Sequence, residues 1–183
     1  MLRRLLAVAA MALVFALPAA AQSNTNPENI LVLETNKGTV EIALRPDLAP
    51  AHVERIKTLA REGFYDDVVF HRVIEGFMAQ TGDPTGTGAG GSDYPDLKAE
   101  FTDTPYERGT VGMARAQSPD SANSQFFIMF NRVPSLDGQY TVFGEVIDGM
   151  DVVDSIKKGS KSANGRVSNP DRIVDAYIAA DKN

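Results

Sequence analysis

The sequence predicts a mainly β protein, folded as an antiparallel barrel or sandwich. Three observations support this prediction. Short apolar segments of alternating polarity recur along the chain, turn-forming residues separate them, and only two segments carry the period of an amphipathic helix. The two helices do not alternate regularly with the strands, as the crossover helices of a parallel sheet would.

A β-hairpin and a helix are predicted first. The segments ILVLET and TVEIAL alternate in hydrophobicity on either side of NKG, a turn signal, so residues 30–44 should pair as a hairpin. Over residues 50–63 the period becomes helical, with Pro50 suited to the first position and Gly63 to the end. His52 falls in the first turn, where we expect it to be solvated.

The remainder of the chain predicts mostly strands. VVFHRVI, residues 68–74, has strand character, and the glycine-rich stretch that follows it to Gly91 is typical of a loop. Further strands are predicted over residues 109–116, 124–131, 140–147 and 172–180. A second helix fits GMDVVDSIKKG, residues 149–159, with Asp148 as its expected cap.

The N-terminus carries the pattern of a secretory signal. Arg3 and Arg4 precede the apolar run LLAVAAMALVFAL, Pro18 breaks the run, and small residues follow. The run has about 13 residues, whereas a membrane span needs ~20. We expect cleavage between Ala21 and Gln22 and export by the general rather than the twin-arginine route. The predicted signal peptide, polar leader and single domain cover residues 1–21, 22–29 and 30–183.

The cysteine content and the charge of the chain restrict its expected compartment and binding partners. The chain has no cysteine, so neither a lipoprotein anchor nor a disulfide is available. A bacterial signal without an anchor favours the periplasm, with full secretion as the alternative. Loss of Arg3 and Arg4 on cleavage changes the formal charge from −6 to −8. Such an acidic chain is a poor candidate for binding nucleic acid or an anionic membrane.

Several kinds of chemistry lack their usual sequence patterns. Gly86, Gly88 and Gly91 have G-x-G-x-x-G spacing, but no strand precedes them and no helix follows to present free amides to a pyrophosphate. The two histidines, His52 and His71, do not have metal-ligand spacing. No G-x-S-x-G elbow is present, although a triad defined by geometry alone stays open. We therefore expect neither a cofactor nor a metal.

Three separated motifs carry a family resemblance. FHRVIEGFMAQTGD, SQFFIMF and LDGQYTVFGEV, in this order, resemble the cyclophilins, which are peptidyl-prolyl cis–trans isomerases. The resemblance extends from Ile30 to the last predicted strand, and the chain looks like a bacterial, exported member. It implies a closed eight-stranded antiparallel β-barrel capped by two α-helices, with the active site on the outer face of the barrel.

The resemblance also assigns site residues by motif position. Those assigned to catalysis are Arg72, Phe77 and Gln80. Those assigned to substrate binding are Met78, Ala114, Arg115, Phe127, Leu136 and Tyr140. Phe77, Met78, Phe127 and Leu136 would form the proline pocket, and Gln80 would bind the peptide backbone. Ala114 and Arg115 would line the groove for the residue before proline, and Tyr140 stands where many relatives have a histidine.

The implied function is isomerisation of X-Pro peptide bonds, which assists the folding of exported proteins. No bond is made or broken, so the missing nucleophile and metal patterns agree with this function. The expected partners are proline-containing peptides and unfolded exported proteins, and we expect a monomer without a membrane anchor. The alternative is a proline-peptide binding module without useful turnover, which the presence of Arg72, Phe77 and Gln80 disfavours. A structural or adhesion protein has little support.

One position departs from the best-known relatives. In cytosolic cyclophilins a tryptophan directly before L-D-G helps to bind the cyclic peptide cyclosporin, and here that position is Ser135. We therefore expect weak cyclosporin binding.

Overall fold

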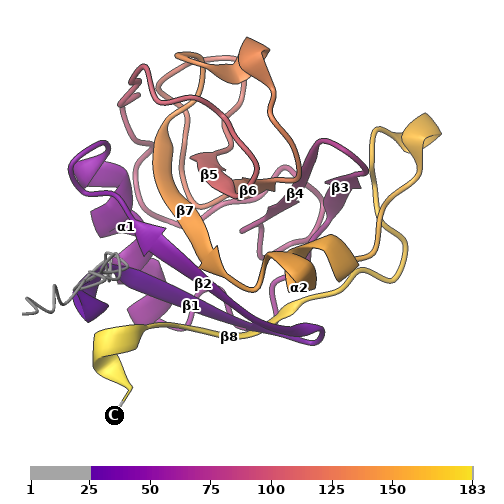
Figure 1. The fold of residues 1–183 in the computed structure, drawn as a ribbon, viewed down its shortest axis with the longest axis horizontal. Helices are drawn as coiled ribbons and strands as arrows, with labels where there is room; N and C mark the ends of the chain where they lie inside the picture. The colour runs from indigo at the N-terminus through magenta and orange to yellow at the C-terminus, as the bar shows by residue number, and fades with distance from the viewer. Residues whose placement is uncertain (1–25, 183) are drawn as a thin grey trace, which may run out of the picture.

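A computed structural model describes residues 26–182 (Figure 1). Its strands are β1 Ile30–Thr35, β2 Gly38–Leu44, β3 Arg72–Ile74, β4 Met78–Thr81, β5 Thr110–Met113, β6 Phe126–Met129, β7 Val142–Asp148 and β8 Ile173–Ile178. Its α-helices are α1 Pro50–Arg61 and α2 Met150–Ser155. Short 3-10 helices cover Pro27–Asn29, Pro134–Leu136, Lys161–Ala163 and Ala179–Asp181. Neither α-helix in the described range is long and apolar enough to cross a membrane.

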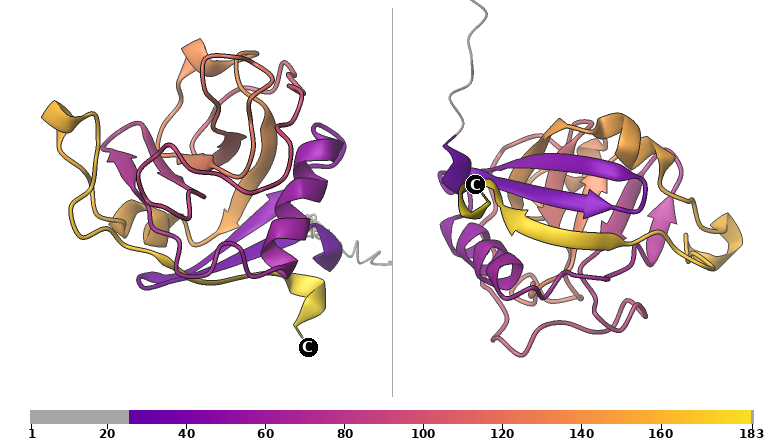
Figure 2. Two further views of the ribbon diagram at one scale, coloured as in Figure 1. Left: turned by 180° about the vertical axis from the view of Figure 1, so that it is seen from behind. Right: turned by 90° about the horizontal axis from the view of Figure 1, so that it is seen from below.

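The eight strands form one curled sheet in the order β3-β4-β6-β5-β7-β2-β1-β8. Every pair of neighbours is antiparallel, which confirms the predicted mainly β, antiparallel class. Seen from below in Figure 2, β2, β1 and β8 lie side by side with the remaining strands behind them. The main hydrophobic core fills the inside of this curl, and α1 packs against it through Val53, Ile56 and Leu59.

The sheet is open, so the expected closed barrel is wrong. The two edge strands, β3 and β8, are not paired as a ladder. Asn164 and Asn169 adopt positive φ, and Pro170 has no N–H group, so the chain ahead of β8 cannot continue as a regular strand. Single backbone bonds span the gap instead, such as the 2.9 Å bond from the Phe70 N–H to the Asp171 carbonyl.

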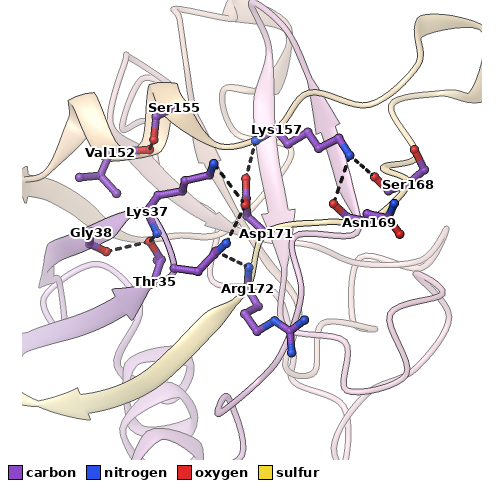
Figure 3. Close-up of polar contacts among 11 residues, drawn as sticks. Thr35, Lys37, Gly38, Val152, Ser155, Lys157, Ser168, Asn169, Asp171 and Arg172 are labelled. Atoms are coloured by element: carbon purple, nitrogen blue, oxygen red, sulfur yellow. Dashed lines mark hydrogen bonds and ion pairs between the residues drawn. The ribbon is translucent and has the colours of Figure 1, made fainter.

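Asp171 joins three segments beside this gap (Figure 3). It is 7% exposed, and its carboxylate accepts hydrogen bonds of 2.8 Å from both the Asn36 side-chain amide and the Lys157 backbone N–H. The Lys37 ammonium lies 3.6 Å from the same carboxylate. Because the Asp171 carbonyl also binds the backbone just before β3, this cluster fixes the edge of the sheet on which the candidate site is built.

The predicted hairpin and first helix are confirmed. β1 and β2 pair from Ile30 opposite Ala43 to Thr35 opposite Gly38, so the turn lies where NKG indicated. Pro50 is the first residue of α1, which ends at Arg61.

The expectation that His52 is solvated is wrong. Its side chain is fully buried, and its Nδ1 lies 2.6 Å from the Glu100 carboxylate. Glu100 also accepts bonds of 3.2 Å from the free N–H groups of Ala51 and His52, and therefore caps a helix whose N-cap residue, Ala49, has no polar side chain. Burial lowers the pKa of His52, and the Glu100 carboxylate opposes this shift.

Three smaller predictions also differ from the structure. β4 lies where a loop was expected. Three of its four residues are buried, so its sequence lacks the alternation of polar and apolar residues that indicates a half-buried strand. β3 is confined to Arg72–Ile74, shorter than the predicted strand. Asp148 does not cap α2: Gly149 occupies the cap position with φ of 83°, and no side chain caps the helix. The other predicted strands are present: β5, β6 and β8 are shorter at both ends, and β7 begins two residues later and ends one residue later than predicted.

Candidate active site

A row of paired residues crosses the strands at the open edge. Arg72 on β3 lies opposite Gln80 on β4, Gln80 lies opposite Phe127 on β6, and Phe127 lies opposite Gly112 on β5. Side chains that are paired across strands share one face of a sheet. The adjacent row faces the core and consists of Val73, Ala79, Ile128 and Val111. The period of two therefore places the functional row on the outer face.

The Arg72 guanidinium is held in place by uncharged oxygen atoms. Its Nη1 donates to the Gln80 side-chain oxygen at 3.1 Å. Its Nε donates to the Asn164 carbonyl and its Nη2 to the Asn164 side-chain oxygen, both at 3.1 Å. Burial lowers the pKa of Arg72, and Tyr140 partly opposes this effect. Arginine nevertheless keeps its charge in proteins, so a fixed, partly desolvated cation results.

This guanidinium borders a pocket of about 110 Å³ on the outer face. The residues that line it are Arg72, Phe77, Met78, Gln80, Ala114, Arg115, Phe127, Leu136 and Tyr140. All nine residues singled out from the sequence thus meet at one place, although their individual roles stay predictions. Among the described residues, those that line this pocket include no serine, histidine or carboxylate. Five of them have large apolar or aromatic side chains.

An aromatic stack supports the pocket from below. Tyr106 is fully buried and stacks on Phe127 with centroids 5.7 Å apart, and Tyr140 meets Phe127 edge-on, also at 5.7 Å. The close approach depends on Gly112, because a Cβ there would lie 2.3 Å from the Tyr106 oxygen and 2.8 Å from a Phe127 ring carbon. Sequence reasoning missed Tyr106 and Gly112, since the register of β5 and β6 places Gly112 opposite Phe127 and only the folded loop before β5 brings Tyr106 against the same ring.

A second, larger hollow of about 540 Å³ adjoins the pocket. The two share Gln80, Ala114 and Arg115. The Gln80 amide donates to the side-chain oxygen of Gln125 at 2.9 Å, and the Gln125 amide donates to the Gly90 carbonyl at 2.8 Å. Gln80 is therefore fixed from both sides, by Arg72 and by Gln125, which is itself bonded to the glycine-rich loop. Gln125 and Asn164 are further contributors that the sequence analysis did not identify.

The glycine-rich loop is organised by one buried carboxylate. Asp83 is 0% exposed and accepts bonds from the N–H groups of Thr85, Thr87, Gly88 and Gly90, at 2.8, 3.1, 2.6 and 3.1 Å. Burial alone would raise the pKa of Asp83, but the hydrogen bonds from Thr85, Gly90 and Gly88 outweigh it and hold the pKa at about 2. The amides that a phosphate would need in this G-x-G-x-x-G segment are thus already donated to Asp83.

Asp83→Asn should destabilise the fold in a pH-dependent way. The native pKa of about 2 lies below that of an unfolded aspartate, so ionised Asp83 contributes stability above pH 4 that is lost as the pH falls towards 2. The shift corresponds to about 2 kcal/mol at neutral pH. Urea unfolding should show this deficit in full at pH 7 and about half of it at pH 3, because most of the loss occurs between pH 4 and pH 2. Asp93→Asn, at an exposed position of the same region, is the control. An equal deficit at both pH values would contradict this account.

Comparisons with known structures agree with the fold, which is that of a cyclophilin-like protein. A cyclophilin from Hirschia baltica has a TM-score of 0.78 at 29% identity, covering 87% of this chain and 77% of its own. A cyclophilin-type peptidyl-prolyl cis-trans isomerase of Cryptosporidium parvum, crystallised in the presence of the dipeptide Ala-Pro, has a TM-score of 0.75 at 31% identity, covering 81% and 98%.

Sequence comparisons give the family. Residues 30–178 match the family described as "Cyclophilin type peptidyl-prolyl cis-trans isomerase/CLD". A probable peptidyl-prolyl cis-trans isomerase of Brucella suis is 58% identical over 170 residues, 87% of each chain. A peptidyl-prolyl cis-trans isomerase of Helicobacter pylori is 45% identical over 131 residues, 69% of this chain and 79% of its own. The chain belongs to the cyclophilin-type peptidyl-prolyl cis–trans isomerases, and its activity class is that of an X-Pro isomerase.

Proposed function

We propose that this enzyme accelerates rotation about X-Pro bonds in exported proteins, with Arg72 as the catalytic group. The observation that carries the proposal is the fixed Arg72 guanidinium at the wall of a small apolar pocket. Phe77, Met78, Phe127 and Leu136 would hold the prolyl ring.

The chemistry that this arrangement must perform is the loss of amide resonance. Rotation about a peptide C–N bond faces a barrier of ~18–20 kcal/mol. In the twisted transition state the prolyl nitrogen becomes pyramidal and gains a localised lone pair, which the planar ground state lacks. Arg72 would donate a hydrogen bond to this lone pair, and an interaction made only in the transition state raises turnover.

Gln80 would hold the peptide backbone while the carbonyl group before proline rotates. Its side chain is suited to this because it is bonded to both Arg72 and Gln125 and so loses little freedom on binding. Ala114 and Arg115 would guide the residues that precede proline towards the larger hollow. The dipeptide Ala-Pro used with the Cryptosporidium parvum relative supports proline-containing ligands for this pocket.

A proline-isomerisation assay on a short X-Pro peptide tests the proposal. We expect an exchange rate that rises linearly with enzyme concentration. A binding module would bind the same peptide without changing its exchange rate, and that outcome would overturn the proposed turnover.

We also propose that the protein is exported to the periplasm and assists folding there. The pattern of residues 1–21 supports this, although it lies outside the described residues. Full-length protein expressed in a Gram-negative host should be recovered from the periplasmic fraction with Gln22 as its first residue. Membrane-bound protein that retains Met1 would show that the segment is an anchor instead.

A further inference from the structure

Arg115 carries a positive charge at the wall shared by the proline pocket and the larger hollow. Its guanidinium carbon lies 4.5 Å from the centre of the Tyr140 ring. Its Nε and Nη2 donate to the Gln139 carbonyl at 3.3 and 3.0 Å. Its Nη1 donates to the carbonyls of Ala116 and Gln117 at 3.1 and 3.2 Å. The cation is thus fixed in position rather than free to move with solvent.

No carboxylate of residues 26–182 forms an ion pair with Arg115. This differs from Arg45, Arg61, Arg108 and Arg132, each of which is paired with a carboxylate. The chain has 24 acidic and 18 basic residues, so potential partners are abundant. Since an arginine has five N–H donors and four bonds to carbonyls are made through Nε, Nη1 and one Nη2 hydrogen, one Nη2 N–H remains.

The neighbouring charges make this part of the surface locally positive. Arg72 and Arg115 both line the proline pocket, and no acidic residue of the described chain lines it. In the larger hollow the acidic lining residue is Asp96, whose carboxylate accepts a bond from the Asn123 amide at 3.1 Å. A substrate that lay across both hollows would therefore meet two guanidinium groups, on a protein whose overall charge is negative.

We infer that Arg115 makes the enzyme prefer an acidic side chain, glutamate or aspartate, at one of the two positions that precede proline. The inference rests on the proposed function, which seats the prolyl ring in the smaller pocket. The peptide then leaves this pocket over Gln80, Ala114 and Arg115, which are common to both hollows. A carboxylate there would pair with the remaining N–H and the charge of Arg115, which the protein itself leaves uncompensated.

Matched peptides test this preference. Glutamate and glutamine are placed in turn at each of the two positions before proline, and kcat/KM is measured after the uncatalysed rate of each peptide is subtracted. Because partly exposed ion pairs are weak, we expect the glutamate peptide to be favoured about threefold at one position in low salt. The ratio should fall towards one in 0.5 M salt, where charges are screened beyond about 4 Å.

Two variants distinguish the effect of Arg115 on peptide preference from the effect of the protein's overall electrostatic field. Arg115→Gln should bring the glutamate-to-glutamine ratio close to one at both salt concentrations. Arg172→Gln removes the same charge from an exposed site, outside the residues that line either hollow, and should keep the wild-type ratio. A ratio near one for the wild type at both positions, or a ratio that Arg115→Gln preserves, would overturn the inference.

Peptide binding, measured by fluorescence titration, distinguishes failure of the Arg115 preference from failure of the proposed isomerase function. If the wild type does not catalyse exchange but binds the glutamate peptide more tightly through Arg115, the proposed turnover fails and the preference stands. If it isomerises both peptides equally and binds them equally, the turnover stands and the preference fails.

Discussion

Arg72→Ala should lower kcat/KM for an X-Pro peptide at least tenfold and leave the melting profile nearly unchanged. A charge-assisted hydrogen bond contributes ~1.5–3 kcal/mol, and each factor of ten in rate needs about 1.4 kcal/mol, so the loss should span one to two orders of magnitude. The side chain lies on the outer face of the sheet and bonds to Gln80 and the exposed Asn164, so its removal leaves the core intact. Activity is measured by proline isomerisation and folding by circular dichroism.

Two further variants sharpen this test. Arg72→Lys keeps the charge but replaces a planar fork with a point charge, so it should recover little of the lost activity. Arg166→Ala removes an exposed arginine whose backbone bridges that of Arg72 but which does not line the pocket, so it should retain full turnover. Undiminished activity of Arg72→Ala, or equal losses in Arg72→Ala and Arg166→Ala, would remove Arg72 from the mechanism.

The location of the pocket could be predicted because three short motifs resemble those of the cyclophilins. Motif positions identified Arg72, Gln80 and Phe127, and the pairing of β3, β4 and β6 brings them into one row. The hairpin of β1 and β2 was equally accessible, since alternation and a turn signal are properties of a few neighbouring residues. The features predicted correctly therefore rest either on the family resemblance of short motifs or on patterns of a few neighbouring residues.

The errors concern contacts between distant segments. Helical periodicity places His52 on α1 but does not show Glu100, 48 residues away, whose carboxylate covers it. The contact between Arg72 and Asn164 spans 92 residues. Whether the sheet closes depends on the chain before β8, where Asn169 has positive φ. Such features depend on the register and packing of the folded chain, and no short motif records them.

Ser135→Trp should tighten inhibition by cyclosporin roughly tenfold or more, and the wild type should bind cyclosporin weakly. Ser135 is exposed in the 3-10 helix Pro134–Leu136, directly before Leu136 at the rim of the proline pocket. A tryptophan there would add apolar contact of roughly 100 Å², worth up to about 2.5 kcal/mol at ~25 cal/mol/Å². It would also supply an indole N–H donor. Proline turnover should change little, since the residues proposed to hold the prolyl ring are retained.

Cyclosporin titration of the wild type and the variant in one isomerisation assay measures the effect. Ser168→Trp adds a tryptophan at an exposed position outside the pocket lining and controls for nonspecific binding of an apolar ligand. Because the drug is apolar and the pocket already offers Phe77, Phe127 and Leu136, the gain depends on whether residue 135 extends that surface. Equal inhibition constants for Ser135→Trp and wild type, or nanomolar inhibition of the wild type, would show that residue 135 does not set the affinity.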